Sequence, residues 1–222
     1  IATNVVVENH EMKFTVETSV FVLPVSGRHH LIAALSAIAI GRRIDMTDEE
    51  IQTGLSSFTA TEGRTRTLSI GPWTVIDDTY NANPLSMSAA CRTLKDWKTP
   101  GKKILFAGDM LSLGEWSENF HHLLGEEVTR SKIDCLITFG SQAALVAGSA
   151  RKNGMDAGCL GTCRDQETAM LLLDLWLEPG DVLLIKGSRG MKMESFLPLL
   201  HQLAKSKSET LPLQDSIQRK VA

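Results

Sequence analysis

Short apolar runs alternate with longer segments of helical periodicity along most of this chain. From residue 73 onward, each run of three to five mainly apolar residues leads through a loop into a stretch whose apolar positions recur every three or four residues. This pattern predicts strands at 73–76, 104–107, 135–139 and 182–185, a weaker strand near 158–160, and helices at 85–97, 117–130, 142–152, 166–177 and 191–204. Such alternation favours an α/β fold in which a mostly parallel, Rossmann-like sheet carries helices on both faces.

The first sixty residues follow a different pattern. Three short apolar stretches at 5–7, 13–16 and 20–23 predict antiparallel strands, the first two joined by a turn at 9–11. An almost wholly apolar helix is expected at 28–40 with Gly41 as its C-cap, followed by a helix at 48–57 with Thr47 as its N-cap. A helix this apolar should be buried on most faces. Three small strands can hardly cover it, so we expect part of its partner surface to be missing.

These patterns divide the chain into three parts. Residues 1–60 are expected to form a small β-plus-helix unit, residues 61–204 the α/β domain, and residues 205–222 a polar tail that frays. The polar stretch 59–66 is the predicted linker between the first two parts. Because the chain begins with Ile1 instead of Met, we expect it to be a piece of a longer polypeptide.

The composition argues against several classes of protein. A net charge of −3 argues against a broad nucleic-acid surface, and no apolar run reaches the roughly 18 residues of a membrane span. No secretory signal is visible, so the cysteines are expected to be reduced thiols of a cytoplasmic protein. Cys159 and Cys163 lie close together, but no further His or Cys stands at metal-ligand spacing, so no metal site is predicted.

Charged residues gather in the loops that follow the predicted strands. The most informative stretch, 77–84, contains Asp77 and Asp78 and leads into a helix through an Asn-Pro pair suited to an N-cap and a first turn. Asp109 follows another strand, and residues 186–189 follow a third. Loops after parallel strands meet at one edge of the sheet, where carboxylates bind ribose and cations bind phosphate or carboxylate. The sequence therefore predicts a site for an anionic ligand there, although such an aspartate can also be a simple helix cap and residues 186–189 a solvated turn.

Two further observations limit this site. No phosphate-binding loop of the form Gly-x-x-x-x-Gly-Lys-Ser/Thr occurs in the chain, so a loop that cradles ATP phosphates would lie outside it. His29 and His30 open the apolar helix, where packing at the helix start is a more economical interpretation than ligand contact.

Several motifs together resemble those of the Mur ligase family. They run in family order from about residue 20 to residue 200, and the set is more specific than any one member. The motifs are Gly27-Arg28-His29, Glu62-Gly63-Arg64, Asp77-Asp78-Thr79-Tyr80-Asn81-Ala82-Asn83-Pro84, Gly108-Asp109-Met110-Leu111 with Leu113-Gly114-Glu115, His121 four residues before Gly125, and Lys186-Gly187-Ser188-Arg189-Gly190 with Met193-Glu194.

The resemblance implies a three-domain enzyme, of which this chain would hold the end of the central ATPase domain, about residues 1–60, and the whole C-terminal domain. It implies ATP-dependent amide formation through an acyl phosphate in cytoplasmic peptidoglycan precursor synthesis. The motifs are most similar to those of members that join D-Ala-D-Ala to UDP-N-acetylmuramoyl-tripeptide. A fragment without the phosphate loop is expected to be inactive alone, and we expect a monomer.

The resemblance also implies roles for individual residues. Asp78 would bind the ATP ribose, Arg64 would reach the nucleotide from the linker, and the His30 ring would replace an asparagine that usually serves the adenine; Ala33 stands where the family usually has a second asparagine. The substrate-binding candidates, for the dipeptide or the tripeptide end, are Asn81, Lys186, Ser188 and Arg189. No catalytic or metal-binding residue is assigned within the chain, because ATP and Mg²⁺ would be held mainly by the missing part of the central domain. The competing interpretation is a non-catalytic ligand-binding or interaction module with a Mur-ligase-like fold.

Overall fold

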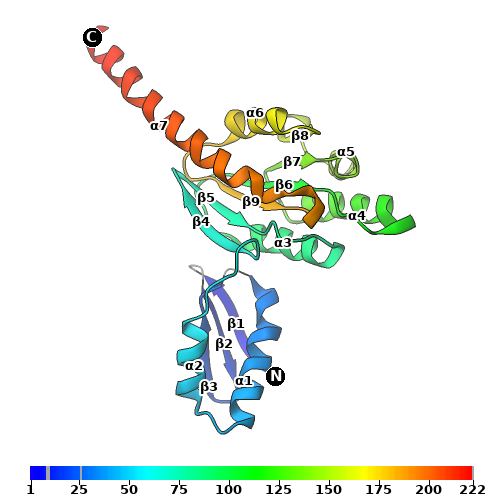
Figure 1. The fold of residues 1–222 in the computed structure, drawn as a ribbon, viewed down its shortest axis with the longest axis vertical. Helices are drawn as coiled ribbons and strands as arrows, with labels where there is room; N and C mark the ends of the chain where they lie inside the picture. The colour runs from blue at the N-terminus through cyan, green and yellow to red at the C-terminus, as the bar shows by residue number, and fades with distance from the viewer. Residues whose placement is uncertain (9–10, 26, 222) are drawn as a thin grey trace.

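The computed structural model describes residues 1–8, 11–25 and 27–221, and only the backbone of 210–221. The chain is built on two separate sheets (Figure 1). The smaller unit contains antiparallel strands β1 Ala2–Glu8, β2 Glu11–Val16 and β3 Ser19–Leu23, and helices α1 Leu31–Arg43 and α2 Asp48–Ser56. Phe14 and Phe21 of its strands pack in one core with Ile38 and Ile51 of its helices. The expected strands and helices are thus present, whereas most of the expected turn at 9–11 lies outside the described residues.

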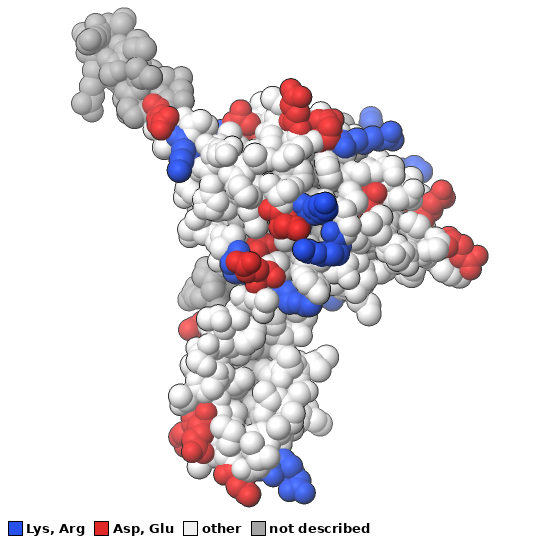
Figure 2. Space-filling view, viewed as in Figure 1, with Lys and Arg blue, Asp and Glu red and all other residues white. Residues whose placement is uncertain are grey.

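Helix α1 differs from expectation at its end and in its burial. Gly41 is not a cap, because the helix continues to Arg43; it is buried where a Cβ atom would lie 2.8 Å from Ile51, so α1 needs glycine to pack against α2. Only one side of α1 is buried, and Ile32 and Ile40 are 77% and 64% exposed. Figure 2 shows few charged side chains on the visible face of this unit except at its far end. The N-cap of α2 is confirmed, since Thr47 forms a capping box.

The larger unit is a six-stranded, mostly parallel sheet with strand order β4-β5-β9-β6-β7-β8. Its strands are β4 Arg66–Ile70, β5 Trp73–Asp77, β6 Lys103–Gly108, β7 Cys135–Phe139, β8 Leu160–Cys163 and β9 Val182–Lys186. Only β4 is antiparallel to its neighbour. Its helices are α3 Pro84–Asp96, α4 Ser117–Arg130, α5 Ala143–Lys152, α6 Gln166–Trp176 and α7 Phe196–Val221. Its short 3₁₀ turns are η2 Gly114–Trp116, η3 Ala157–Cys159, η4 Arg189–Met191 and η5 Met193–Ser195, while η1 Arg28–His30 precedes α1 in the smaller unit.

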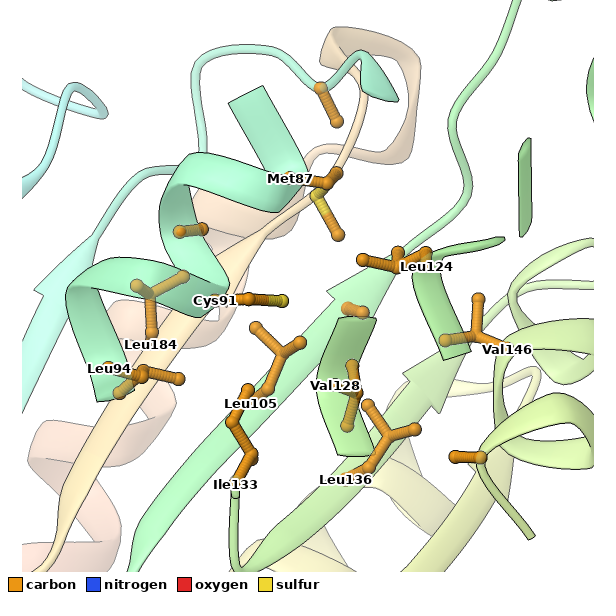
Figure 3. Packing of buried hydrophobic residues seen from close by; sticks show 14 of the residues in the cluster. Met87, Cys91, Leu94, Leu105, Leu124, Val128, Ile133, Leu136, Val146 and Leu184 are labelled. Carbon is orange, nitrogen blue, oxygen red and sulfur yellow. The ribbon is translucent and has the colours of Figure 1, made fainter. Parts of the chain in front are cut away.

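Helices cover both faces of this sheet, as the sequence predicts. Alternate residues of each central strand point into opposite cores, so Leu105 packs with α3, α4 and α5, whereas Phe106 packs with α6 and α7. Figure 3 shows the first core, where Met87 and Cys91 of α3 face Leu124 and other apolar side chains. Burial on both faces explains why these strands appear in the sequence as continuous apolar runs.

Three details of the larger unit were not predicted correctly. Strand β4 was missed because it is an edge strand with alternating exposed polar residues. The last helix begins at Phe196, later than the expected residue 191, because Lys192 has the left-handed conformation with φ of +51°. The polar tail expected to fray from residue 205 instead continues α7 as far as Val221 in the described backbone. No helix among the described residues has both the length and the apolar character needed to cross a bilayer.

Candidate functional site

The carboxyl ends of β5, β9 and β6 form one continuous edge of the larger sheet. Strand β9 lies between the other two and is parallel to both, with Asp77 in register with Ile185 and Ala107 in register with Lys186. The loops after these strands therefore meet, although 105 residues separate Asn81 from Lys186. The reversal of strand order at β9 makes this edge a topological switch point, where open α/β sheets bind ligands.

Asp78 and Lys186 form a largely buried ion pair at this edge. The Asp78 Oδ2 and Lys186 Nζ atoms lie 2.7 Å apart, and the two side chains are 15% and 3% exposed. Lys186 also donates to the Asn81 carbonyl oxygen at 2.8 Å, while Thr65 donates its backbone N–H and its hydroxyl to Asp78 Oδ1 at 3.1 and 3.3 Å. Burial raises the pKa of Asp78 above its usual range, against the opposing effects of Lys186 and Thr65. Two residues predicted to bind different ligands are thus partners of each other.

Asp77 fixes the linker to the end of β5. Its Oδ2 atom accepts the Gly63 backbone N–H at 2.9 Å, and its Oδ1 atom accepts the Thr79 hydroxyl at 2.7 Å. The Gly63 carbonyl in turn accepts the Tyr80 backbone N–H at 2.9 Å. Gly63 has φ of +71°, and a Cβ atom there would lie 2.9 Å from the Tyr80 nitrogen, so glycine is required both for its conformation and for the close approach. This docking brings Arg64 to the site.

A cleft of about 830 Å³ lies between the smaller unit and α3, beside the ion pair. Its volume is in the range of small-molecule sites. Arg64, Arg92 and Lys186 line it together with one carboxylate, Asp78, among the described residues. Figure 2 shows charged side chains of both signs gathered where the two units meet. The excess of cations suits an anionic ligand.

His30 and His29 line this cleft, a position that allows ligand contact as well as packing at the helix start. The His30 Nε2 atom is buried and has no hydrogen-bond partner among the described residues. Burial lowers the pKa of His30 to about 4, helped by His29 and opposed by Asp78, so the ring is neutral at pH 7. The His29 Nε2 atom lies 3.3 Å from the Thr65 hydroxyl, and burial, then Lys186 and Arg92, lower the pKa of His29.

The other predicted substrate residues differ in their accessibility. Ser188 is 4% exposed, and its hydroxyl accepts the Leu111 N–H at 2.8 Å and donates to the Ala82 carbonyl at 3.3 Å, so it ties the edge loops together. Asn81 is exposed, and its Oδ1 atom accepts the Ala82 N–H at 2.9 Å. Arg189 is exposed and forms an ion pair with Glu194 at 3.0 Å.

Sequence reasoning missed the contacts of Tyr80. The guanidinium carbons of Arg64 and Arg189 lie 4.0 and 5.9 Å from the centroid of its ring. A signal was available, because Tyr80 is the one tyrosine of the chain and stands in the loop with Asp78. An aromatic residue in a polar loop has no core to fill there, which points to a contact with ligand or with cations.

Other polar residues of the edge have structural roles. Asp109 is buried, and its Oδ1 atom accepts the Ala143 N–H at 2.6 Å at the start of α5. His121 is fully buried; its Nε2 atom lies 3.1 Å from the Met110 backbone N–H and its Nδ1 atom 2.7 Å from the Ser117 carbonyl oxygen, so Nε2 accepts and Nδ1 carries the proton. The four cysteines are free thiols, and the described residues contain no group of three metal-ligating side chains.

Comparison with known proteins gives a family match that begins within the linker and reaches the loop after β9. The family described as "Mur ligase, glutamate ligase domain" matches residues 63–189, more than half of the chain. The UDP-N-acetylmuramoyl-tripeptide–D-alanyl-D-alanine ligase of Bacillus subtilis (strain 168) is 33% identical over 178 residues, which cover 80% of this chain and 39% of the relative. The ligase of the same name from Escherichia coli (strain K12) is 32% identical over 209 residues, which cover 90% of this chain and 44% of the relative.

Solved structures agree with this match. MurF from Acinetobacter baumannii has a TM-score of 0.80 and 29% identity, covering 90% of this chain and 45% of its own. MurF ligase from Thermotoga maritima, solved in complex with ADP, shares the fold with a TM-score of 0.77 at 23% identity. The match covers 93% of this chain and 47% of that protein. The chain thus spans less than half the length of these proteins. From the match over residues 63–189 and the shared fold, we conclude that the chain belongs to the Mur ligase family.

Proposed function

We propose that this chain is part of an ATP-dependent ligase that joins D-Ala-D-Ala to UDP-N-acetylmuramoyl-tripeptide in peptidoglycan precursor synthesis. The observation that carries the proposal is its similarity, over 80% and 90% of its residues, to two ligases of that name. The cation-rich cleft at the switch point supports it, because the reaction needs a site for a nucleotide next to a site for charged peptides.

Asp78 fits a role in binding ribose. A carboxylate offers about four acceptor positions, and two donors of Thr65 and one of Lys186 occupy three of them. One position remains for a ribose hydroxyl, and the ion pair holds the carboxylate in place for it. The unpartnered His30 Nε2 atom and the exposed Phe58 ring offer a polar atom and an apolar face to adenine.

The phosphate end would lie near Arg64. Phosphoryl transfer depends on positioning and charge neutralisation, which guanidinium and ammonium groups provide. We expect Mg²⁺ to be bound by ATP phosphates and by residues of a phosphate loop that the chain does not contain, since the donor groups of the described residues form no suitable cluster. When bound, Mg²⁺ would neutralise the phosphate oxygens.

The reaction would form and use an acyl phosphate. A carboxylate oxygen of the tripeptide attacks the γ-phosphorus of ATP, and ADP leaves. The amine of D-Ala-D-Ala then attacks the acyl carbon, phosphate leaves and one proton is released. Arg189 and the Asn81 amide, both exposed, would bind the incoming dipeptide or the tripeptide end, and Ser188 would act by holding the edge loops together.

The remaining expectations belong to the same proposal. The chain would divide into a part of the central domain up to residue 60 and a C-terminal domain at 61–204. The protein would be a cytoplasmic monomer, and the chain alone would be inactive without a phosphate loop.

Phosphate release tests the proposal. The complete product of the gene that encodes this chain is mixed with ATP, Mg²⁺, UDP-N-acetylmuramoyl-tripeptide and D-Ala-D-Ala, and phosphate is measured. Release should require both peptide substrates, and L-Ala-L-Ala should not replace D-Ala-D-Ala. No dependence on D-Ala-D-Ala would reject the ligase assignment, and turnover by the 222-residue chain alone would reject the claim that it lacks essential parts.

One feature favours a non-catalytic binding module. His30 and Ala33 stand where the resemblance leads us to expect asparagines. Calorimetry of ATP with the complete gene product discriminates between the two functions: absence of binding would favour the module, and binding with Mg²⁺ would favour the ligase.

A further inference from the structure

Tyr80 lines the cleft, and its ring lies close to the side chains of Arg64 and Arg189. The guanidinium carbon of Arg64 is 4.0 Å from the ring centroid, and that of Arg189 is 5.9 Å away. Both distances fall within the range of about 6 Å for cation–π contacts. Arg64 comes from the linker before β4, whereas Arg189 comes from the loop after β9. The ring therefore brings together cations from two distant segments of the chain.

Hydrophobic burial does not explain this ring. Tyr80 is 46% exposed, although its backbone is fixed by the hydrogen bond to the Gly63 carbonyl at 2.9 Å. Gly63 is itself held by Asp77 at 2.9 Å. The contacts that dock the linker on β5 thus also set Arg64 over the ring.

The two arginines carry more positive charge than their surroundings neutralise. Arg189 is paired with Glu194 at 3.0 Å, yet its side chain remains 65% exposed. Arg64 is exposed and has no carboxylate partner in the described part of the chain. The nearby Asp78 carboxylate is already paired with Lys186. A net positive charge therefore remains at the edge of the cleft.

We propose that Tyr80 is a positioning residue that holds Arg64 and Arg189 as a pair, and that this pair binds one phosphoryl group of the reacting molecules. The inference rests on the proposed function and goes beyond it in joining two residues with separate expected ligands. A guanidinium over an aromatic face keeps its N–H donors at its own edge, where phosphate oxygens accept them bidentately. Holding the two groups before the ligand arrives reduces the side-chain entropy lost on binding.

Kinetics of the complete gene product with Tyr80→Leu and Tyr80→Phe test the positioning role. Phenylalanine keeps the aromatic face, so kcat should stay within about twofold of the parent, whereas leucine should lower kcat about tenfold. The KM for ATP should rise in Tyr80→Leu. Equal activities of the two variants, whether both retained or both lost, would overturn the proposal. An inactive parent would instead count against the proposed function.

A second measurement does not depend on turnover. Because Tyr80 is the one tyrosine, 3-fluorotyrosine labelling of the 222-residue chain gives a single ¹⁹F resonance from this ring. Arg64→Gln and Arg189→Gln should each shift the resonance. Arg164→Gln should not, since it changes an exposed arginine after β8, three strands away from β9 at the same sheet edge. A resonance that neither Arg64→Gln nor Arg189→Gln moves would overturn the proposal.

The same label tests the ligand. Inorganic pyrophosphate should move the resonance saturably in the parent chain and in Arg164→Gln, and much less in Arg64→Gln and Arg189→Gln. No movement in the parent, or equal movement in all four proteins, would show that the arginines do not form a phosphoryl site.

Discussion

Removing the charge of Asp78 while Lys186 stays in place should destabilise the fold strongly. In Asp78→Asn the side chain keeps an acceptor for Thr65 but no longer neutralises the Lys186 ammonium, which is 3% exposed. Removing one partner of a buried ion pair costs about 3–5 kcal/mol, because an uncompensated charge remains. We therefore expect the free energy of unfolding to fall by about that amount at pH 7.

Removing both charges should be much less damaging. Burial already disfavours the charged form of Asp78, as its raised pKa indicates, so the pair contributes little net stability. In the double variant Asp78→Asn/Lys186→Met, the main loss is the hydrogen bond to the Asn81 carbonyl, about 1 kcal/mol. The double variant should thus be more stable than Asp78→Asn.

Urea unfolding followed by tryptophan fluorescence measures the parent, Asp78→Asn and the double variant at pH 7. Arg130→Gln is the control, because it breaks an exposed pair with Glu127 and should change stability by less than about 1 kcal/mol. A cost of less than about 1 kcal/mol for Asp78→Asn, or a double variant as unstable as this single one, would refute the reasoning.

Other sites give independent tests. Gly63→Ala should cost about 1–3 kcal/mol in urea unfolding, because φ is +71° and the added Cβ would lie 2.9 Å from a backbone nitrogen; unchanged stability would mean that the linker is not docked. Gly125→Ala should lower the thermal midpoint, with a cost of about 1–3 kcal/mol, because its Cβ would lie 2.5 Å from atoms of α5; Gly148→Ala, with nothing within 4 Å, is the control and should not destabilise. The pKa of His30 is about 4 in the folded chain, against 6.5 when unfolded, so acid protonates the unfolded chain first. The contribution of His30 to stability is therefore complete above pH 6.5 and is lost as the pH falls through 4. His30→Gln should reduce acid destabilisation in that window, and identical pH–stability curves would contradict this.

The main elements of the larger unit could be predicted because their signals are local. Strands such as β6 are buried on both faces and appear as apolar runs, while α3 is marked by the Asn83 cap and Pro84. Strand β4 has no such run, because an edge strand with one exposed face alternates like a polar loop. Helix α7 begins at Phe196, later than the predicted residue 191, because Lys192 is left-handed. Hydrophobic periodicity does not reveal a left-handed residue.

The sequence by itself determined which residues could carry chemistry and which edge of the sheet would hold them. It placed Asp78, Lys186 and Arg189 in loops after parallel strands, and such loops must meet at one edge. Only the tertiary structure decided that β9 lies between β5 and β6. That non-local pairing makes Asp78 the partner of Lys186 and brings Arg64 and Arg189 to Tyr80. The availability and pKa of a side chain depend on burial and on neighbours from distant segments, and sequence spacing does not encode either.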